Sequence, residues 1–459
     1  MKVVSISDVL KHHIKIKTKI TVRGWIKTKR DSKSGISFIH IYDGSCINNL
    51  QIIVPNTIKN YSEVKKLNSG CSVIILGNLE KSVGRSQIYD LYAHDIKIIG
   101  TIKNPENYPI SAKNHSIEYL REVSHLRART KIIGVISRIR HHLAQSFFSF
   151  LNQEGFLWIP TPILTSLDTE GAGEMFYVSH MKSTETLQNN QKNFFGKESY
   201  LTVSGQLNLE CFACALSKVY NFGPVFRAEN SNTSRHLSEF WMLEAEIAFY
   251  KLNDIIVFIK SMLKNVLENL LKTCMDDIDF LKKTVNENIL SHFEYFICNN
   301  IEEIEYDDVV KILKKYENNF ERKIFWGMDF FAEHEKYITE KYFKKPVIIK
   351  NFPKKIKAFY MRLNEDEKTV AAIDVLVPGI GEIIGGSQRE ERLKYLDNRI
   401  QEMGLIKKDY WWYRDLRRYG TVHHSGFGLG FERLLSYVTG IKNVRDVIPF
   451  PRTPKNINF

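Results

Sequence analysis

Strand patterns follow one another closely in this 459-residue sequence, without a regular alternation of strands and helices. Two of them, 218–229 and 239–249, are separated only by a short polar stretch. A short connection joins antiparallel strands, whereas a parallel pair needs a crossover of a dozen or more residues. The larger part of the chain therefore predicts a mixed or antiparallel sheet and disfavours a doubly wound α/β fold.

The first 100 residues have a pattern of their own, which is five short strands separated by Gly, Asp and Asn. Apolar residues alternate along them, as expected for strands with one face in a core. Five such strands fit a small closed barrel, and the OB-fold is the barrel most often used to hold single-stranded nucleic acid. A barrel with a purely structural role is the alternative. The predicted strands are 19–30, 35–43, 48–54, 71–82 and 88–100.

A polar segment with two prolines, 101–124, is predicted to link this barrel (1–100) to a larger domain at 125–459. The larger domain begins with a helix, because apolar residues recur at three- and four-residue steps until Gly155. The predicted fold class is α+β, with an OB barrel followed by an antiparallel sheet flanked by helices.

Two further segments of the larger domain have predicted structures. A charged, mostly helical stretch at about 252–323 is expected to be an insertion packed on the periphery of the sheet, and 357–363 is expected to be a strand. The chain has neither G-x-x-x-x-G-K-[ST] nor G-x-G-x-x-G after a strand, so nothing supports a P-loop or Rossmann nucleotide site.

The net charge of +13 suits a polyanionic partner such as tRNA, since lysine and arginine release counterions from phosphates. A general enrichment in Lys, Ile and Asn explains much of the same charge. The start of the sequence lacks the long apolar stretch of a signal peptide, and no uncharged apolar run approaches the ~20 residues that cross a bilayer. We therefore expect a cytoplasmic protein without a membrane partner.

The cysteines and histidines predict no zinc site. Cys211 and Cys214 form a C-x-x-C, but they lie in a helical pattern where packing at i,i+3 explains the spacing. The doublets His12–His13, His141–His142 and His423–His424 have no matching partners at ligand spacing.

Residues 222–249 predict two strands joined by a polar loop that carries several charges. Arg227 and Glu229 would point to the same face because side chains alternate along a strand, while Arg235 and His236 lie in the loop. An arginine on a rigid strand can hold a phosphate bidentately, and the ring of Phe240 can stack on a base. A surface salt bridge between Arg227 and Glu229 is the alternative.

The segment 426–440, GFGLGFERLLSYVTG, favours the nucleotide interpretation. Its glycines let a ligand approach the backbone closely, and they lead into Arg433 at the start of a helical pattern. An arginine at this position can stack on a purine.

Together these segments resemble the class II aminoacyl-tRNA synthetases, in the subgroup that charges Asp, Asn and Lys. The segment around Pro162 resembles the first class motif, 226–244 the second and 428–435 the third, and VRDVIPFPRTP at 444–454 is typical of the subgroup. The resemblance covers nearly the whole chain. It implies a homodimer formed through the first motif, and the substrates ATP, an amino acid and tRNA.

The same resemblance implies roles for the charged residues. Arg227 would hold the α-phosphate, His236 the distal phosphates, and Phe240 and Arg433 would enclose the adenine, so that Arg227 and Arg433 carry catalysis. The implied ATP-binding set is Arg227, Glu229, Arg235, His236, Phe240 and Arg433.

Asp374 and Glu382 resemble the magnesium ligands of the family. Triphosphate chemistry needs charge neutralisation, and Mg²⁺ prefers carboxylate and phosphate oxygens. The pattern of 371–386 brings the two acids near each other on paired strands. As isolated acids they would be solvated surface groups.

The segment 204–210, SGQLNLE, favours asparagine as the amino acid. Aspartate enzymes have a lysine at the position of Leu209, and Leu209 removes the cation that would pair with a carboxylate. Glu210 would accept hydrogen bonds from an amide NH₂ and repel a carboxylate, while Arg389 would donate to the amide oxygen. By resemblance, the α-amino end would be held by Glu170, Ser204 and Gln206.

In the barrel, Arg30, Phe38 and Gln51 match positions that related enzymes use on the anticodon. Phe38 would stack on a base and Gln51 would contact a base edge. The alternative for Phe38 is an ordinary strand residue.

Two rival functions are distinguishable by sequence features. An aspartyl enzyme that charges two tRNAs predicts a cation at Leu209, which is absent. A non-catalytic RNA-binding relative predicts the loss of phosphate or metal groups, whereas Arg227, Asp374, Glu382 and Arg433 are all present.

Overall fold

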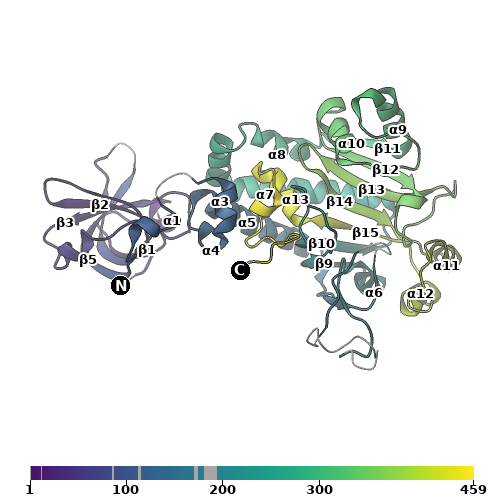
Figure 1. Ribbon diagram of the computed structural model, residues 1–459, viewed down its shortest axis with the longest axis horizontal. Coiled ribbons are helices and arrows are strands. Elements are labelled where there is room, and N and C mark those ends of the chain that lie inside the picture. Colours follow the sequence, from purple (N-terminus) through teal and green to yellow (C-terminus); the bar gives the residue numbers. More distant parts are fainter. Residues whose placement is uncertain (1, 12, 85–86, 112–114, 170–173, 180–193) are drawn as a thin grey trace. The chain divides into compact units, whose positions relative to one another are not determined.

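The computed structural model describes residues 2–11, 13–84, 87–111, 115–169, 174–179 and 194–459 (Figure 1). The chain divides into two compact units, the first made of residues 1–137 with Phe459 and the second of residues 138–458. None of the described helices is both long and apolar enough to cross a membrane.

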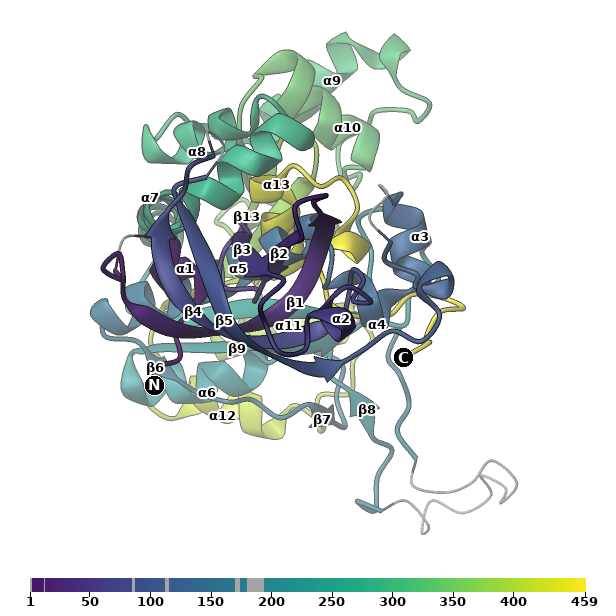
Figure 2. The ribbon, with the colours of Figure 1, turned by 90° about the vertical axis from the view of Figure 1, so that its left-hand side faces the viewer.

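The first unit contains a closed five-stranded barrel (Figure 2). Its strand order is β1-β2-β3-β5-β4, with β3 and β5 parallel and the other pairs antiparallel. All five predicted barrel strands are present, so this part of the fold prediction is confirmed. The strands are β1 (Lys19–Asp31), β2 (Ile36–Tyr42), β3 (Leu50–Pro55), β4 (Ser72–Lys81) and β5 (Tyr89–Gly100).

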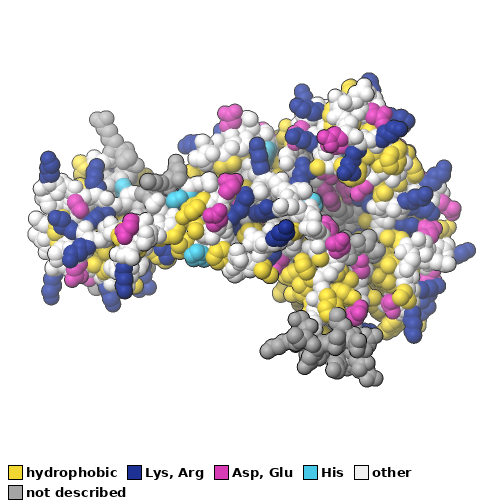
Figure 3. All heavy atoms as spheres, viewed as in Figure 1, with side chains coloured by type: hydrophobic (Ala, Val, Ile, Leu, Met, Phe, Trp, Pro, Cys, Tyr) yellow, Lys and Arg dark blue, Asp and Glu magenta, His cyan; other side chains and the backbone are white. Residues whose placement is uncertain are grey.

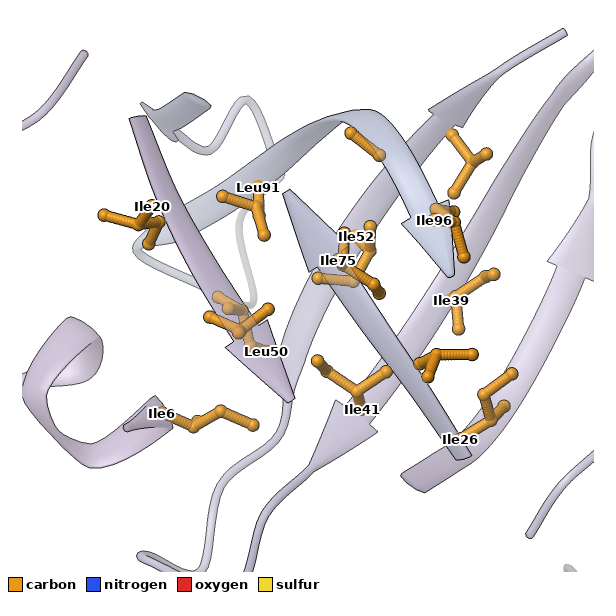
Figure 4. Packing of buried hydrophobic residues seen from close by; sticks show 14 of the residues in the cluster. Ile6, Ile20, Ile26, Ile39, Ile41, Leu50, Ile52, Ile75, Leu91 and Ile96 are labelled. Carbon is orange, nitrogen blue, oxygen red and sulfur yellow. The ribbon is translucent and has the colours of Figure 1, made fainter. Parts of the chain in front are cut away.

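The barrel is filled by aliphatic side chains that alternate along the strands. In β2, the core residues Ile39 and Ile41 are buried. They alternate with Phe38 and His40, which are only partly buried. Figure 4 shows Ile and Leu side chains from the barrel strands pointing toward one another, together with Ile6 of α1 (Ile6–Leu10). The period of two thus separates a packed interior from an outer face.

The first unit also contains short helices that the strand pattern does not predict. They are α2 (Tyr61–Val64), η1 (Pro105–Asn107), α3 (Ile117–Glu122) and α4 (Ser124–Arg127). The segment expected to be a linker therefore contains helix α3, whose N-cap Ser116 accepts a hydrogen bond from the backbone N–H of Tyr119.

An eight-stranded sheet forms the centre of the second unit, in the order β11-β12-β13-β14-β15-β10-β9-β6. Neighbouring strands are antiparallel except at the two edges, where β11 pairs with β12 and β6 with β9 in parallel. The predicted mixed or antiparallel sheet is confirmed. Its strands are β6 (Leu157–Trp158), β9 (Lys218–Phe226), β10 (Glu239–Ala248), β11 (Glu302–Glu305), β12 (Val347–Pro353), β13 (Thr369–Val377), β14 (Gly381–Gln388) and β15 (His424–Gly430). A separate pair is formed by β7 (Leu164–Thr165) and β8 (Tyr200–Leu201).

Helices surround the sheet. The predicted first helix is α5 (Lys131–Gln153), and it ends before Gly155, whose φ of +80° suits a residue without a Cβ. The other helices are α6 (Gln206–Leu216), α7 (Leu252–Thr284), α8 (Ile289–Ile297), α9 (Tyr306–Lys315), α10 (Ala332–Lys336), α11 (Leu393–Glu402), α12 (Trp411–Arg418) and α13 (Phe431–Thr439), with the short turns η3 (Glu317–Asn319), η4 (Tyr337–Tyr342), η5 (Lys354–Ile356) and η6 (Val444–Asp446).

Two expectations for the second unit need correction. Helix α7 contacts β13, β14 and β15, so the 252–323 segment covers strands in the middle of the sheet and does not lie only at its periphery. The reason is an apolar stripe along α7 that is buried from Ile255 to Leu281. The expected strand at 357–363 is an irregular segment after η5, with isolated bridges at Met361 and Leu363.

Candidate active site

Strand β10 forms one wall of the site, because every second side chain along it points to the same face. Phe240, Met242, Glu244 and Glu246 face two adjoining cavities, whereas Leu243, Ala245 and Ile247 are fully buried in the core. The carboxylate of Glu246 has room on this face because its cross-strand partner on β15 is Gly426. A Cβ at that position would lie only 2.0 Å from the carboxylate.

The first cavity encloses about 820 Å³ of space, including the solvent at its open mouth. The Arg227 guanidinium lies 5.5 Å from the centre of the Phe240 ring. Arg433, in the first turn of α13, donates to the backbone carbonyl of Glu382 at 2.9 Å. The cavity wall includes every residue of the predicted ATP-binding set: Arg227, Glu229, Arg235, His236, Phe240 and Arg433.

Two loop side chains of this cavity, those of Arg235 and His236, have close neighbours. The His236 ring nitrogen Nδ1 lies 2.6 Å from the Thr233 hydroxyl, and burial, with Arg433 nearby, lowers the pKa of His236. Arg235 Nη1 lies 3.1 Å from a carboxylate oxygen of Glu335. Burial and the nearby Glu382 raise the pKa of Glu335 to about 7. Glu335 was not predicted from the sequence as a residue of the site.

The second cavity contains three of the residues predicted to bind an amino acid, Ser204, Gln206 and Arg389. Arg389 is buried and donates through Nε to Glu246 at 3.1 Å. Ser204 donates through its hydroxyl to Glu244, which also accepts from the backbone N–H of Gly205 at 3.0 and 3.1 Å.

Sequence reasoning missed several residues of the second cavity. Glu244 and Glu246 belong to a strand that the pattern identifies, and their even spacing from Phe240 would have placed them on the same face. Lys357 and Tyr360 had no such signal, because their irregular segment was expected to be a strand. All four line the cavity.

The two cavities share part of one wall. Arg227, Met242, Glu382 and Gly428 line both of them. A ligand that fills the first cavity can therefore meet a ligand in the second beside Arg227.

Asp374 on β13 and Glu382 on β14 come together at this shared wall. Gly385 lies between them, because a Cβ there would be 2.9 Å from an oxygen of Glu382 and 3.8 Å from an oxygen of Asp374. A glycine thus leaves open the space between two carboxylates, and this donor set fits a Mg²⁺ ion. Lys357 Nζ donates to both oxygens of Asp374, at 2.8 and 2.7 Å.

Glu210, which was expected to contact the amide of the substrate, has partners within the protein for its carboxylate. Its carboxylate is fully buried and accepts hydrogen bonds from Gln206, Tyr413 and Arg417, with the His424 ring at 2.9 Å. It lines neither cavity. Despite its burial, Arg417 and His424 hold the pKa of Glu210 well below its usual range.

Leu209 also points away from both cavities. It packs with Ala213 and Val219 in a small buried cluster. Leu209 thus lies on the core side of α6. Glu170 lies outside the described residues.

On the barrel, the three predicted anticodon residues lie on neighbouring strands. Arg30 on β1 is the cross-strand partner of Phe38 on β2, and its guanidinium lies 5.3 Å from the Phe38 ring. Gln51 on β3 is the partner of His40, and its amide donates to Asp90 at 3.0 Å. None of the three is buried, so they remain candidates for a shared outer surface.

Comparisons with known proteins agree with this arrangement. Residues 116–454 match the family model for class II tRNA synthetases (D, K and N), and residues 20–99 match an OB-fold nucleic acid binding domain. The chain is 57% identical to an asparagine–tRNA ligase of Buchnera aphidicola and 59% identical to one of Blochmanniella pennsylvanica, over the full length of each protein.

Solved structures give the same result. An asparaginyl-tRNA synthetase from Pyrococcus horikoshii, complexed with asparaginyl-adenylate, is 31% identical with a TM-score of 0.87, and covers 100% of this chain and 99% of its own. An asparaginyl-tRNA synthetase from Entamoeba histolytica, also with asparaginyl-adenylate, is 25% identical with a TM-score of 0.84. The chain therefore belongs to the class II tRNA synthetases of the D, K and N group, and within that group to the asparagine–tRNA ligases.

Proposed function

We propose that this protein activates L-asparagine with ATP and then transfers the asparaginyl group to the 3′ end of tRNA. The observation that carries the proposal is the shared wall of the two cavities, at which Arg227 lies. A nucleotide in one cavity and an amino acid in the other would meet there, as adenylate formation requires.

In the first step the asparagine carboxylate attacks the α-phosphorus of ATP and pyrophosphate leaves. Arg227 is assigned to the α-phosphate, and Phe240 and Arg433 to the two faces of adenine. Arg235 and His236 are assigned to the distal phosphates, and Glu229 to the same nucleotide. No side-chain nucleophile is needed, because positioning and charge stabilisation supply the rate enhancement.

Mg²⁺ would neutralise phosphate charge in this step. Asp374 and Glu382 are assigned as its protein ligands, because both carboxylates border the open space beside Gly385.

Asparagine would lie in the second cavity, with Arg389 as donor to its amide oxygen. Ser204, Gln206 and Glu170 are assigned to its α-amino end. The buried carboxyl groups of Glu244 and Glu246 line the cavity and can accept hydrogen bonds from an amide NH₂, a donor that the side chain of aspartate lacks, which supports asparagine over aspartate. The contact of Glu210 with the amide, expected from the sequence, is not needed for this preference.

The barrel is assigned to the anticodon, through Arg30, Phe38 and Gln51. Stacking of an unpaired base on Phe38 and hydrogen bonding by Gln51 would suit single-stranded RNA. Charging of tRNA for translation supports a cytoplasmic location.

We also propose that the protein is a homodimer. The edge strand β6, which precedes Pro162, exposes Leu157 and Trp158 to 50% and 56%. Ile163 and Leu164 are exposed as well. Figure 3 shows a group of hydrophobic side chains on the lower side of the second unit. A second copy that covers this edge would bury its exposed residues.

Exchange of labelled pyrophosphate into ATP, measured with each of the twenty amino acids, tests the proposed function. We expect exchange with asparagine and little with aspartate. Preference for aspartate would overturn the specificity, and tRNA binding without ATP binding would indicate a non-catalytic relative.

A further inference from the structure

Lys357 lies where the amino-acid cavity meets the two acids assigned to Mg²⁺. Its ammonium donates to both oxygens of Asp374 at 2.8 and 2.7 Å, and the two side chains are only 15% and 16% exposed. Across the shared wall, Arg433 lies 3.3 Å from a carboxylate oxygen of Glu382. Each of the two acids is thus paired with a cation of the chain itself.

The position of Lys357 is fixed by its surroundings. Its backbone carbonyl accepts from Arg399 at 3.1 Å, and its ammonium lies 4.0 Å from the centre of the Phe352 ring. The side chain is therefore a charged, anchored partner of Asp374.

A metal ion that binds Asp374 would compete with the ammonium for the same two carboxylate oxygens. Two cations on one carboxylate repel each other at close range, and an ammonium that is displaced but stays buried needs another anionic partner. The triphosphate of ATP can supply that partner, together with further oxygen ligands for the metal.

We propose that Lys357 is a positioning residue that competes with the metal ion for Asp374, so that metal binding at Asp374 and Glu382 depends on ATP. Lys357 is thereby released toward the phosphates or the carboxylate of the amino acid at the moment the substrates assemble. This inference rests on the proposed function, because it takes Asp374 and Glu382 as the metal ligands.

The test measures Mn²⁺ binding to the full-length protein by electron paramagnetic resonance, with and without a non-hydrolysable ATP analogue. We expect the wild type to bind Mn²⁺ appreciably only with the analogue. Lys357→Met removes the competing cation and should bind Mn²⁺ without nucleotide at least about tenfold more tightly than the wild type, which corresponds to about 1.4 kcal/mol.

Lys354→Met is the matched control, because Lys354 lies three residues away and pairs with Glu402 outside the cavities. It should bind Mn²⁺ like the wild type. If Lys357→Met does not fold, Lys357→Gln replaces it, and the wild-type titrations do not depend on any variant.

Two results would overturn the inference: equally tight Mn²⁺ binding by the wild type with and without the analogue, or equal nucleotide-free affinities in the wild type and the Lys357 variant. Pyrophosphate exchange by the wild type is measured separately. If the wild type is active in exchange but gives either of those results, the inference about Lys357 is wrong and the proposed function stands.

Discussion

Glu210 shows how a single buried charge ties three elements of the second unit together. It lies on α6, Tyr413 and Arg417 lie on α12, and His424 begins β15. All of them meet at one carboxylate. Gln206, one turn earlier on α6, is the link to the amino-acid cavity, since it donates to Glu210 at 3.0 Å and lines that cavity. Glu210 therefore reaches the cavity through Gln206, and its charge also acts on Arg389 and Glu246, which line the cavity.

We expect Glu210→Ala to lower the free energy of unfolding by about 3–5 kcal/mol, because it leaves the Arg417 charge buried without its carboxylate partner. Urea unfolding followed by circular dichroism measures the change. Glu287→Ala, on an exposed position after α7, is the control and should change stability by no more than about 0.5 kcal/mol. Unchanged stability with a raised KM for asparagine would restore direct substrate contact by Glu210.

Glu335 gives the second prediction at this scale. Burial and Glu382 raise its pKa from near 4.5 to about 7. Between these pH values the folded protein holds a proton that the unfolded chain releases, so the contribution of Glu335 to stability falls as pH rises through this window. As the pH rises from 5 to 8, the free energy of unfolding of Glu335→Gln should therefore fall less than that of the wild type. Urea unfolding at both pH values tests this, and an identical loss in both proteins would exclude Glu335 as the titrating group.

At the scale of elements, local periodicity predicts which segments form but not always what they face. The five barrel strands and β10 follow from alternation alone, because a strand with one buried face repeats every two residues. The apolar stripe of α7 likewise predicts a helix, but periodicity does not say which surface covers the stripe. The same limit applies to Leu209 and Glu210, which are adjacent in sequence but lie about 100° apart around a helix. The ATP-binding residues were found together because two sequence motifs converge on them, whereas Glu335 and Lys357 join the site only through tertiary packing.

The packing of α7 on the sheet is testable with Leu263→Ala. Leu263 is fully buried, so the variant should lower the free energy of unfolding by about 2–5 kcal/mol. Val257→Ala on the same helix is the control, because Val257 is 67% exposed. Urea unfolding distinguishes the two, and a small effect of both variants would mean that α7 is a dispensable addition to the sheet.

At the scale of the whole molecule, the two units are expected to divide the reaction. The second unit holds both cavities, and the barrel holds the candidate anticodon surface. Activation of the amino acid needs only the second unit, whereas transfer needs tRNA bound by both units.

Phe38→Ala should therefore reduce tRNA charging while leaving pyrophosphate exchange nearly intact. A stacked base is worth about 1–3 kcal/mol, so we expect kcat/KM for tRNA to fall by about 5- to 150-fold. Ile99→Ala, an exposed apolar residue of β5, controls for general damage to the barrel. Equal losses in charging and exchange would contradict the division between the units.

The proposed homodimer makes a prediction about the edge of the sheet. Trp158 is 56% exposed on β6, which has one open side because it ends the strand order. A buried aromatic residue at the centre of an interface contributes strongly to binding, and a charge there would be desolvated without a partner. Trp158→Glu should thus shift the protein from dimer to monomer, as measured by light scattering over a range of concentrations. Trp411→Glu is the matched control, since Trp411 is 60% exposed on α12 and should leave the mass unchanged. A wild type that is monomeric at all concentrations would overturn the proposal, and a dimer that survives Trp158→Glu would place the interface elsewhere.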